Sequence, residues 1–123
     1  MNGILRVSAK GSYLATAENA PSIAVMGGGG SHEFLKYFGI ADGKILHDNG
    51  ANSVNYTENS AQLATWLETT DALVISNNKE FTATAKDAIF KRVNNGMPML
   101  IYHPSTWYNW TNWPSYNLSL IHI

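Results

Sequence analysis

A short apolar run followed by four consecutive glycines is the feature that most constrains this chain. Ile23–Met26 is rich in residues that favour β-strands, and Gly27–Gly30 can adopt backbone angles that are closed to other residues. Ser31 then stands where a helix N-cap is expected, and Glu33 falls in the first turn, where negative charge is favoured. A buried strand that ends in glycines and opens a helix is how an α/β sheet forms a crevice that faces a ligand.

The residues after this turn predict a helix with a break. Phe34, Leu35 and Phe38 recur at helical spacing, so we expect them to share one face of the helix. We expect Gly39 to interrupt the helix and a new helical turn to start at Asp42.

Strands and helices then alternate along the chain. Further strands are predicted at Asn52–Tyr56, Ala72–Ile75 and Met97–Tyr102, and helices after an N-cap at Thr57, Asn59 or Ser60 and after Thr82. Strands that alternate with helices imply a parallel sheet covered on both faces. The predicted fold class is therefore α/β, a flavodoxin-like three-layer sandwich with a parallel sheet.

Polar residues follow the predicted strands at the points where the strands end. These residues are Gly27–His32, Thr57-Glu58, Asn77-Asn78 and His103–Ser105. Because the strands of a parallel sheet all point the same way, such residues collect at one edge of the sheet. We expect His32 to lie across a crevice from Asn77 and Asn78, with His103 one strand further on.

Two histidines at the same edge point to proton transfer. An imidazole can act as acid or base near neutral pH, so His32 and His103 are the candidate catalytic residues. The alternative is that each is a hydrogen-bonded structural residue. The pair could also hold a metal ion with Glu33 or Glu58 as a third ligand, but two histidines alone make a sparse site, and no metal or other cofactor is expected.

Backbone and side-chain amides at this edge are candidate ligand-binding groups. The backbone of Gly28, Gly29, Gly30 and Ser31 could hold an anion or a sugar hydroxyl at the helix start, or could simply form a tight turn. The Asn77 and Asn78 side chains could bind sugar hydroxyls, because an amide both donates and accepts hydrogen bonds. The alternative for them is also a turn, where Asn is favoured.

An aromatic segment follows His103 and has neither helical nor strand periodicity. Trp107, Tyr108 and Trp110 could form a stacking wall for sugar rings. The alternative is that the segment buries its own rings as a small satellite core. Trp66 falls on the apolar face of a predicted helix and is assigned to the core.

At this point the sequence resembles the ThuA-like (trehalose-utilisation) family. The resemblance is carried by Ala24–Phe34, Val74–Asn78 and Tyr102–Trp110, in a match from Ile23 to Asn117. It implies a fold like that of class I glutamine amidotransferases and a bacterial role in the metabolism of trehalose or related glycosides. The chain has no cysteine, so the catalytic cysteine of those amidotransferases has no counterpart and their glutaminase activity is not implied.

Two functions from different classes therefore remain open. One is a carbohydrate-processing domain whose ligand lies at the carboxyl ends of the parallel strands. The other is a non-catalytic module that binds a sugar or a partner protein on an amidotransferase-like fold.

The 123 residues suffice for one domain, which we divide into three segments. Residues 1–21 lack a clear period and are interpreted as a disordered leader. Residues 22–117 would be the N-terminal part of a ThuA-like domain, because that family continues beyond the aromatic segment. Leu118–Ile123 resembles the translation of a sequencing adapter and is interpreted as a non-native tail that leaves the sheet incomplete; the alternative is a fifth strand.

The charge balance bears on partners and compartment. The formal net charge is −1, and 14% of the residues are charged, which suggests neither a nucleic acid nor an anionic membrane as partner. A small carbohydrate is the expected partner, and the oligomeric state stays open. A bacterial cytoplasmic location is favoured, with export as the alternative if the N-terminus is a damaged signal peptide.

Overall fold

A computed structural model of the chain describes residues 5–7, 20–30, 32–108 and 110–114. Its five strands are β1 (Leu5–Val7), β2 (Ser22–Met26), β3 (Ser53–Thr57), β4 (Ala72–Ile75) and β5 (Met99–Ile101). They form one sheet in the order β1-β3-β2-β4-β5, in which β2 to β5 run parallel and β1 pairs antiparallel with β3. The predicted α/β class and the flavodoxin-like order of the parallel strands are confirmed.

The edge strand β1 was not predicted. It lies inside residues 1–21, which the sequence analysis treated as a leader without regular structure. Its three residues pair with Val54–Tyr56 of β3. A strand this short offers too few positions for an alternating pattern to be recognised.

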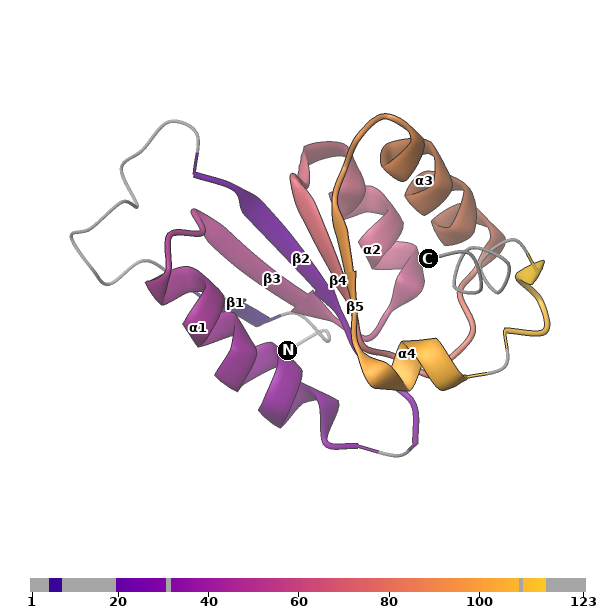
Figure 1. Cartoon of the computed structure of the whole chain (residues 1–123), viewed down its shortest axis with the longest axis horizontal. Coiled ribbons are helices and arrows are strands. Elements are labelled where there is room, and N and C mark those ends of the chain that lie inside the picture. Colours follow the sequence, from indigo (N-terminus) through magenta and orange to yellow (C-terminus); the bar gives the residue numbers. More distant parts are fainter. Residues whose placement is uncertain (1–4, 8–19, 31, 109, 115–123) are drawn as a thin grey trace.

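Helical segments cover both faces of the sheet, which gives the predicted three layers (Figure 1). The segments are η1 (Leu35–Ala41, a π-helix), α1 (Asp42–Asp48), α2 (Ser60–Trp66), η2 (Leu67–Thr69, a 3-10 turn), α3 (Ala83–Asn94) and α4 (His103–Trp107). The first two pack on one face of the sheet, and α2 and α3 pack side by side on the other.

The central strand β2 divides the hydrophobic core between these faces. Ala24 and Met26 join the cluster beneath α2 and α3, whereas Ile23 and Val25 join the cluster beneath η1 and α1. All four side chains are at most 9% exposed. Because successive side chains of a strand point to opposite faces, the apolar run Ile23–Met26 supplies both cores at once.

The predicted helix break at Gly39 is wrong. The π-helix η1 continues directly into α1, with the Asp42 amide donating to the Tyr37 carbonyl. Gly39 is buried, and a Cβ placed on it would lie 2.9 Å from Cγ of Tyr56 in β3. The glycine therefore lets the helix lie close to the sheet, and close packing rather than a helix break explains why this position is a glycine.

Two of the predicted helix starts are confirmed, and one differs in the structure. Asn59 caps α2 through its Oδ1, which accepts from the amides of Ala61 and Gln62, and Thr82 caps α3. Both were among the predicted caps. By contrast, η1 has Phe34 at its N-cap position instead of Ser31, which lies outside the described residues.

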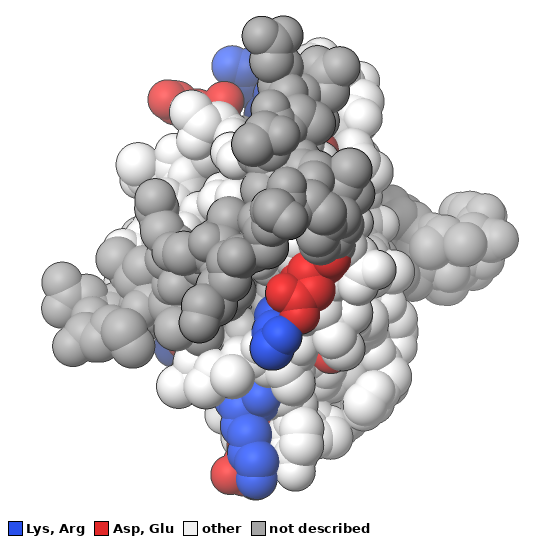
Figure 2. All heavy atoms as spheres, turned by 90° about the vertical axis from the view of Figure 1, so that its left-hand side faces the viewer, with Lys and Arg blue, Asp and Glu red and all other residues white. Residues whose placement is uncertain are grey.

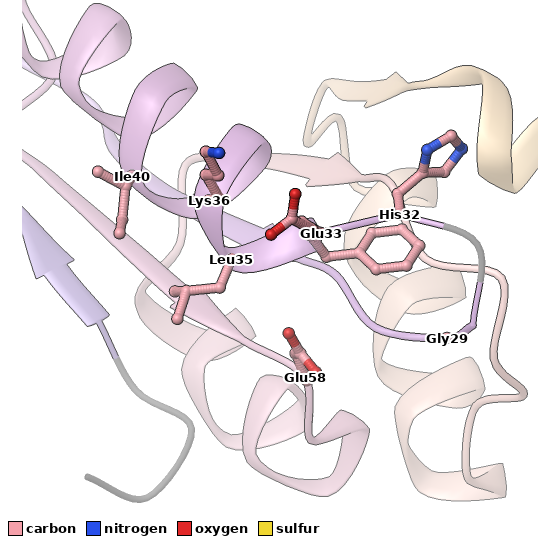
Figure 3. Close-up of a pocket in the computed structure, with 8 residues that line it drawn as sticks. Gly29, His32, Glu33, Leu35, Lys36, Ile40 and Glu58 are labelled. Carbon is pink, nitrogen blue, oxygen red and sulfur yellow. The ribbon is translucent and has the colours of Figure 1, made fainter.

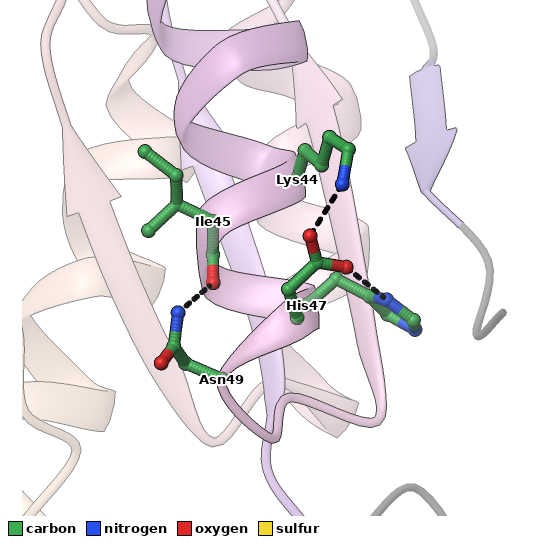
Figure 4. Close-up of polar contacts among 5 residues, drawn as sticks. Lys44, Ile45, His47 and Asn49 are labelled. Carbon is green, nitrogen blue, oxygen red and sulfur yellow. Dashed lines mark hydrogen bonds and ion pairs between the residues drawn. The ribbon is translucent and has the colours of Figure 1, made fainter. Parts of the chain in front are cut away.

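The C-terminal end of α1 is closed by its own side chains. Asn49 donates from Nδ2 to the Ile45 carbonyl over 2.7 Å, and Lys44 forms an ion pair with Asp48 one helical turn away (Figure 4). The Asn49 hydrogen bond satisfies one of the free carbonyls that every helix end presents. Within the described residues, no helix combines the length and the apolar character that crossing a bilayer requires.

Part of the aromatic segment is helical and part of it belongs to the core. Its start is the short helix α4, where a loop was expected. Trp110 is 0% exposed, stacks on Phe81 with ring centroids 5.3 Å apart, and donates from Nε1 to the Ser105 carbonyl over 2.9 Å. Trp113 packs edge-on against the same pair. The satellite-core alternative therefore describes Trp110 and Trp113, and Trp110 presents no face to a ligand.

Replacing Trp110 tests this core role. We expect Trp110→Ala to lower the free energy of unfolding by about 3–5 kcal/mol, since it empties a fully buried site. The control Tyr37→Ala removes an aromatic side chain that is 50% exposed, and should change it by about 0.5 kcal/mol or less. Urea unfolding followed by circular dichroism measures both. Equal losses in the two variants would contradict the placement of Trp110.

Candidate functional site

The carboxyl ends of the four parallel strands lie level with one another. In the sheet register Met26 pairs with both Thr57 and Ile75, and Ile75 pairs with Ile101. Backbone hydrogen bonds continue past these residues, for example from the Gly27 amide to the Thr57 carbonyl over 3.0 Å. The segments that follow the strands therefore meet at one rim, near α4 at the lower edge of the view (Figure 1).

Three glycines of the turn after β2 make room for particular side chains. A Cβ on Gly27 would lie 2.3 Å from the Tyr56 hydroxyl oxygen. Gly28 and Gly29 have φ angles of 109° and 127°, and a Cβ on Gly29 would lie 1.5 Å from Oδ1 of Asn78. Positive φ angles of this size are rarely open to other residues. The tight-turn alternative therefore accounts for these three positions without a ligand.

Gly30 differs from the other three glycines. A Cβ on it would meet nothing within 4 Å. Its amide donates to Oδ1 of Asn78 over 3.3 Å, so this amide is already engaged by the protein. Ser31, the last predicted binding residue of the turn, lies outside the described residues.

His32 and His103 lie at the same rim, as expected from the strand order, and they are in direct contact, which was not predicted. Their Nε2 atoms are 3.2 Å apart, and their rings are nearly perpendicular, with centroids separated by 5.0 Å. Both side chains are exposed to solvent. Because an N–H must face a lone pair in such a contact, one ring is the donor and the other the acceptor. His103 is the first residue of α4, directly after the Tyr102 N-cap position.

An aromatic cluster supports His32 from below. The ring of Phe34 lies edge-on to His32 with centroids 5.7 Å apart, and Phe38 lies 5.8 Å from Phe34 and 5.2 Å from Tyr102. Phe34 is buried, and Phe38 and Tyr102 pack beside the core under η1. Burial raises the pKa of Tyr102, and the neighbouring Asp42 carboxylate raises it further. The helical spacing of Phe34 and Phe38 thus places a rigid apolar base beneath the histidine pair.

The two predicted amides organise the rim itself. Asn77 is fully buried, and its Nδ2 donates to the Lys79 carbonyl over 2.7 Å. Asn78 holds the glycine turn through Gly30. The buried Ser105 hydroxyl donates to the Asn77 carbonyl over 2.6 Å, which ties α4 to the end of β4. For both amides the turn alternative is the better description of these contacts.

The predicted aromatic wall is only partly described. Trp107 belongs to α4, but its side chain lies outside the described part of the structure. Tyr108 is half-buried, lies edge-on to Trp110 with centroids 4.9 Å apart, and donates to Glu80 over 3.4 Å. Together with the burial of Trp110, these contacts turn the two described rings inward.

Sequence reasoning missed the pair formed by Tyr56 and Glu58. The Tyr56 hydroxyl donates to Oε2 of Glu58 over 2.6 Å. Tyr56 is 2% exposed, whereas Glu58 is half-buried at the rim. Burial raises the pKa of Tyr56, and the hydrogen bond to Glu58 and its negative charge raise it further, so the phenol remains a donor at neutral pH. The available signal was the position of Glu58 directly after a predicted strand.

His47, the metal-ligating side chains and the surface charge are the remaining features that concern binding of a metal ion or a polyanion. The described His47 is buried near the far end of α1, with Nδ1 3.9 Å from Asp48 Oδ1 (Figure 4). Among the described residues, no group of three or more His, Asp or Glu side chains is placed to hold a metal ion. Figure 2 shows that acidic and basic side chains lie next to one another on the described part of that face, so neither sign forms a continuous patch there.

No protein-family model, curated protein or solved structure matches the chain.

Alanine at two positions of the turn tests whether the glycines serve packing. We expect Gly27→Ala to lower the free energy of unfolding by about 1–3 kcal/mol, because its Cβ would overlap the Tyr56 hydroxyl. Gly30→Ala in the same turn meets open space and should change it by about 0.5 kcal/mol or less. Chemical denaturation of the two variants measures the difference. A tolerated Gly27→Ala would show that the turn is not packed on Tyr56.

The raised pKa of Tyr56 predicts a dependence of stability on alkaline pH. In the unfolded chain the phenol loses its proton near about pH 10, whereas the folded chain retains it to higher pH. The contribution is therefore fully present below about pH 10 and is lost as the pH rises toward the folded pKa. The measurement is urea unfolding of the wild type and of Tyr56→Phe from about pH 8 to about pH 11, in steps of about 0.5 pH. The variant should lose less stability across this range, and equal losses would contradict the shift.

Proposed function

We propose that this chain is a ThuA-like domain that acts on a carbohydrate, trehalose or a related glycoside, at the carboxyl rim of its parallel strands. In this proposal His32 and His103 transfer protons to and from the substrate. The observation that carries it is the contact of 3.2 Å between the two Nε2 atoms at an exposed rim. The substrate class, a glycoside such as trehalose, comes from the resemblance of the sequence to the ThuA-like family.

The histidine contact suits general acid–base catalysis for two reasons. In the contact one ring donates a hydrogen bond and the other accepts it, so a proton donor and a proton acceptor lie at one place. Both rings are also exposed, so a sugar oxygen can approach either of them. In a pair that holds one extra proton, the imidazolium ring can give a proton to the glycosidic oxygen while the neutral ring takes one from the attacking hydroxyl or water, and proton transfer across the Nε2–Nε2 contact then restores the starting state.

The second function left open by the sequence has less support. A non-catalytic module that stacks sugar rings on the aromatic segment needs exposed aromatic faces. Trp110 is fully buried, and Tyr108 is half-buried against it. Amidotransferase chemistry is also disfavoured, because the chain has no cysteine to act as the nucleophile.

Substitution of each histidine by glutamine tests the proposal. We expect His32→Gln and His103→Gln each to slow turnover by about 100-fold or more, the range of a positioned acid or base. The double variant should be little worse than either single one, because the residues act as a unit. Turnover is measured with a panel of glycosides that includes trehalose.

The matched control is Lys91→Gln, an exposed position in the last turn of α3 at the other end of the sheet. It should turn over substrate at the wild-type rate. Wild-type turnover in either histidine variant, or no turnover of any glycoside by the wild type, would contradict the acid–base role.

A further inference from the structure

A cavity of about 350 Å³ opens between the glycine turn, the start of η1 and the end of β3 (Figure 3). His32 and Gly29 line its edge, so it adjoins the histidine pair. The ring of His32 points away from Glu58 in this view, toward His103. The volume is at the lower end of the range for small-molecule sites, which fits one sugar ring and not a larger ligand.

The lining of this cavity divides into a polar and an apolar part. Glu33, Lys36 and Glu58 supply charged groups. Leu35 and Ile40 supply apolar surface and are 40% and 52% exposed, so they are open to a ligand. A sugar ring has hydroxyls around its edge and apolar C–H groups on its faces, and this lining offers a partner for each. Two carboxylates against one lysine disfavour a phosphate or another anion.

Glu58 is the most firmly placed of the polar groups. Its Oε2 accepts a hydrogen bond of 2.6 Å from the buried Tyr56 hydroxyl. Among the described residues, no group donates a hydrogen bond to its Oε1. A Cβ on Gly28 would lie 3.2 Å from Cβ of Glu58 and 3.6 Å from Oε1. The absence of a side chain at Gly28 therefore keeps this face of the carboxylate open.

We propose that this cavity is a sugar-ring subsite in which Oε1 of Glu58 accepts a hydrogen bond from a ring hydroxyl. Tyr56 is the positioning residue, since it holds the carboxylate through the other oxygen. A ring bound there lies next to His32, where the proton transfer of the proposed function takes place. The inference rests on that function for its substrate class.

Binding measurements on the full chain test this subsite. Trehalose and glucose are titrated into the wild type, Glu58→Gln and Tyr56→Phe by isothermal calorimetry. We expect Glu58→Gln to weaken binding by about tenfold or more, because a hydrogen bond to a charged acceptor is lost. Tyr56→Phe keeps the ring in the core and should weaken binding by a smaller factor, about threefold, because it only loosens the carboxylate.

The matched control is Glu68→Gln, the same chemical change at an exposed position in η2, which precedes β4 at the other end of the sheet. It should bind as the wild type does, and circular dichroism confirms that each variant is folded. His32→Gln should lose turnover but keep most of its saccharide binding. This difference separates the subsite from the catalytic pair.

The possible outcomes distinguish the two proposals. If Glu58→Gln binds saccharide as tightly as the wild type while the histidine variants lose turnover, the subsite is wrong and the acid–base function stands. If the wild type neither binds nor turns over any saccharide, both proposals are overturned. A selective loss of binding in Glu58→Gln, absent in Glu68→Gln, supports the subsite.

Discussion

The ring of Tyr56 determines how closely the glycine turn and the first helix approach the sheet. Gly27 in the turn and Gly39 in η1 both lie against it, and a Cβ on either would come within 3 Å of a ring or hydroxyl atom. Two glycines far apart in the sequence are thus required by one buried side chain. Because the turn and the helix are both packed on this ring, the segment between them is confined to the rim, and that segment carries His32.

Most polar groups at the rim bind one another, which leaves few for a ligand. The Asn78 side chain holds the Gly30 amide, and Ser105 holds the Asn77 carbonyl. Among the described residues, the histidine pair, Glu33 and Lys36 are exposed there, and Glu58 is half-buried. A rim built in this way is rigid around a small number of reactive groups, which is the arrangement that precise positioning of a substrate requires.

The sequence predicted the sheet well because its signals are local and repeated. The apolar runs that became β2 and β4 and the caps at Asn59 and Thr82 were all recognisable. The parallel order of the strands placed both histidines at one rim, but it did not predict that their rings are in direct contact. The roles of Gly39 and Trp110 were harder to predict from the sequence. A glycine that contacts a distant ring has the same local pattern as a helix break. A buried aromatic residue in a segment without periodicity has the same local pattern as a residue that binds a ligand. The Tyr56–Glu58 pair depended on a side-chain contact that no local pattern encodes.

The hydrogen bond between the imidazoles can be observed directly by nuclear magnetic resonance on protein labelled with ¹⁵N at histidine. If His32 and His103 share a proton at the rim, a scalar coupling across the hydrogen bond will connect their two Nε2 nuclei, and it will disappear in His103→Gln. Two Nε2 signals without such a coupling, each unchanged when the other histidine is replaced, would show that the rings do not meet and would contradict the arrangement on which the proposed chemistry depends.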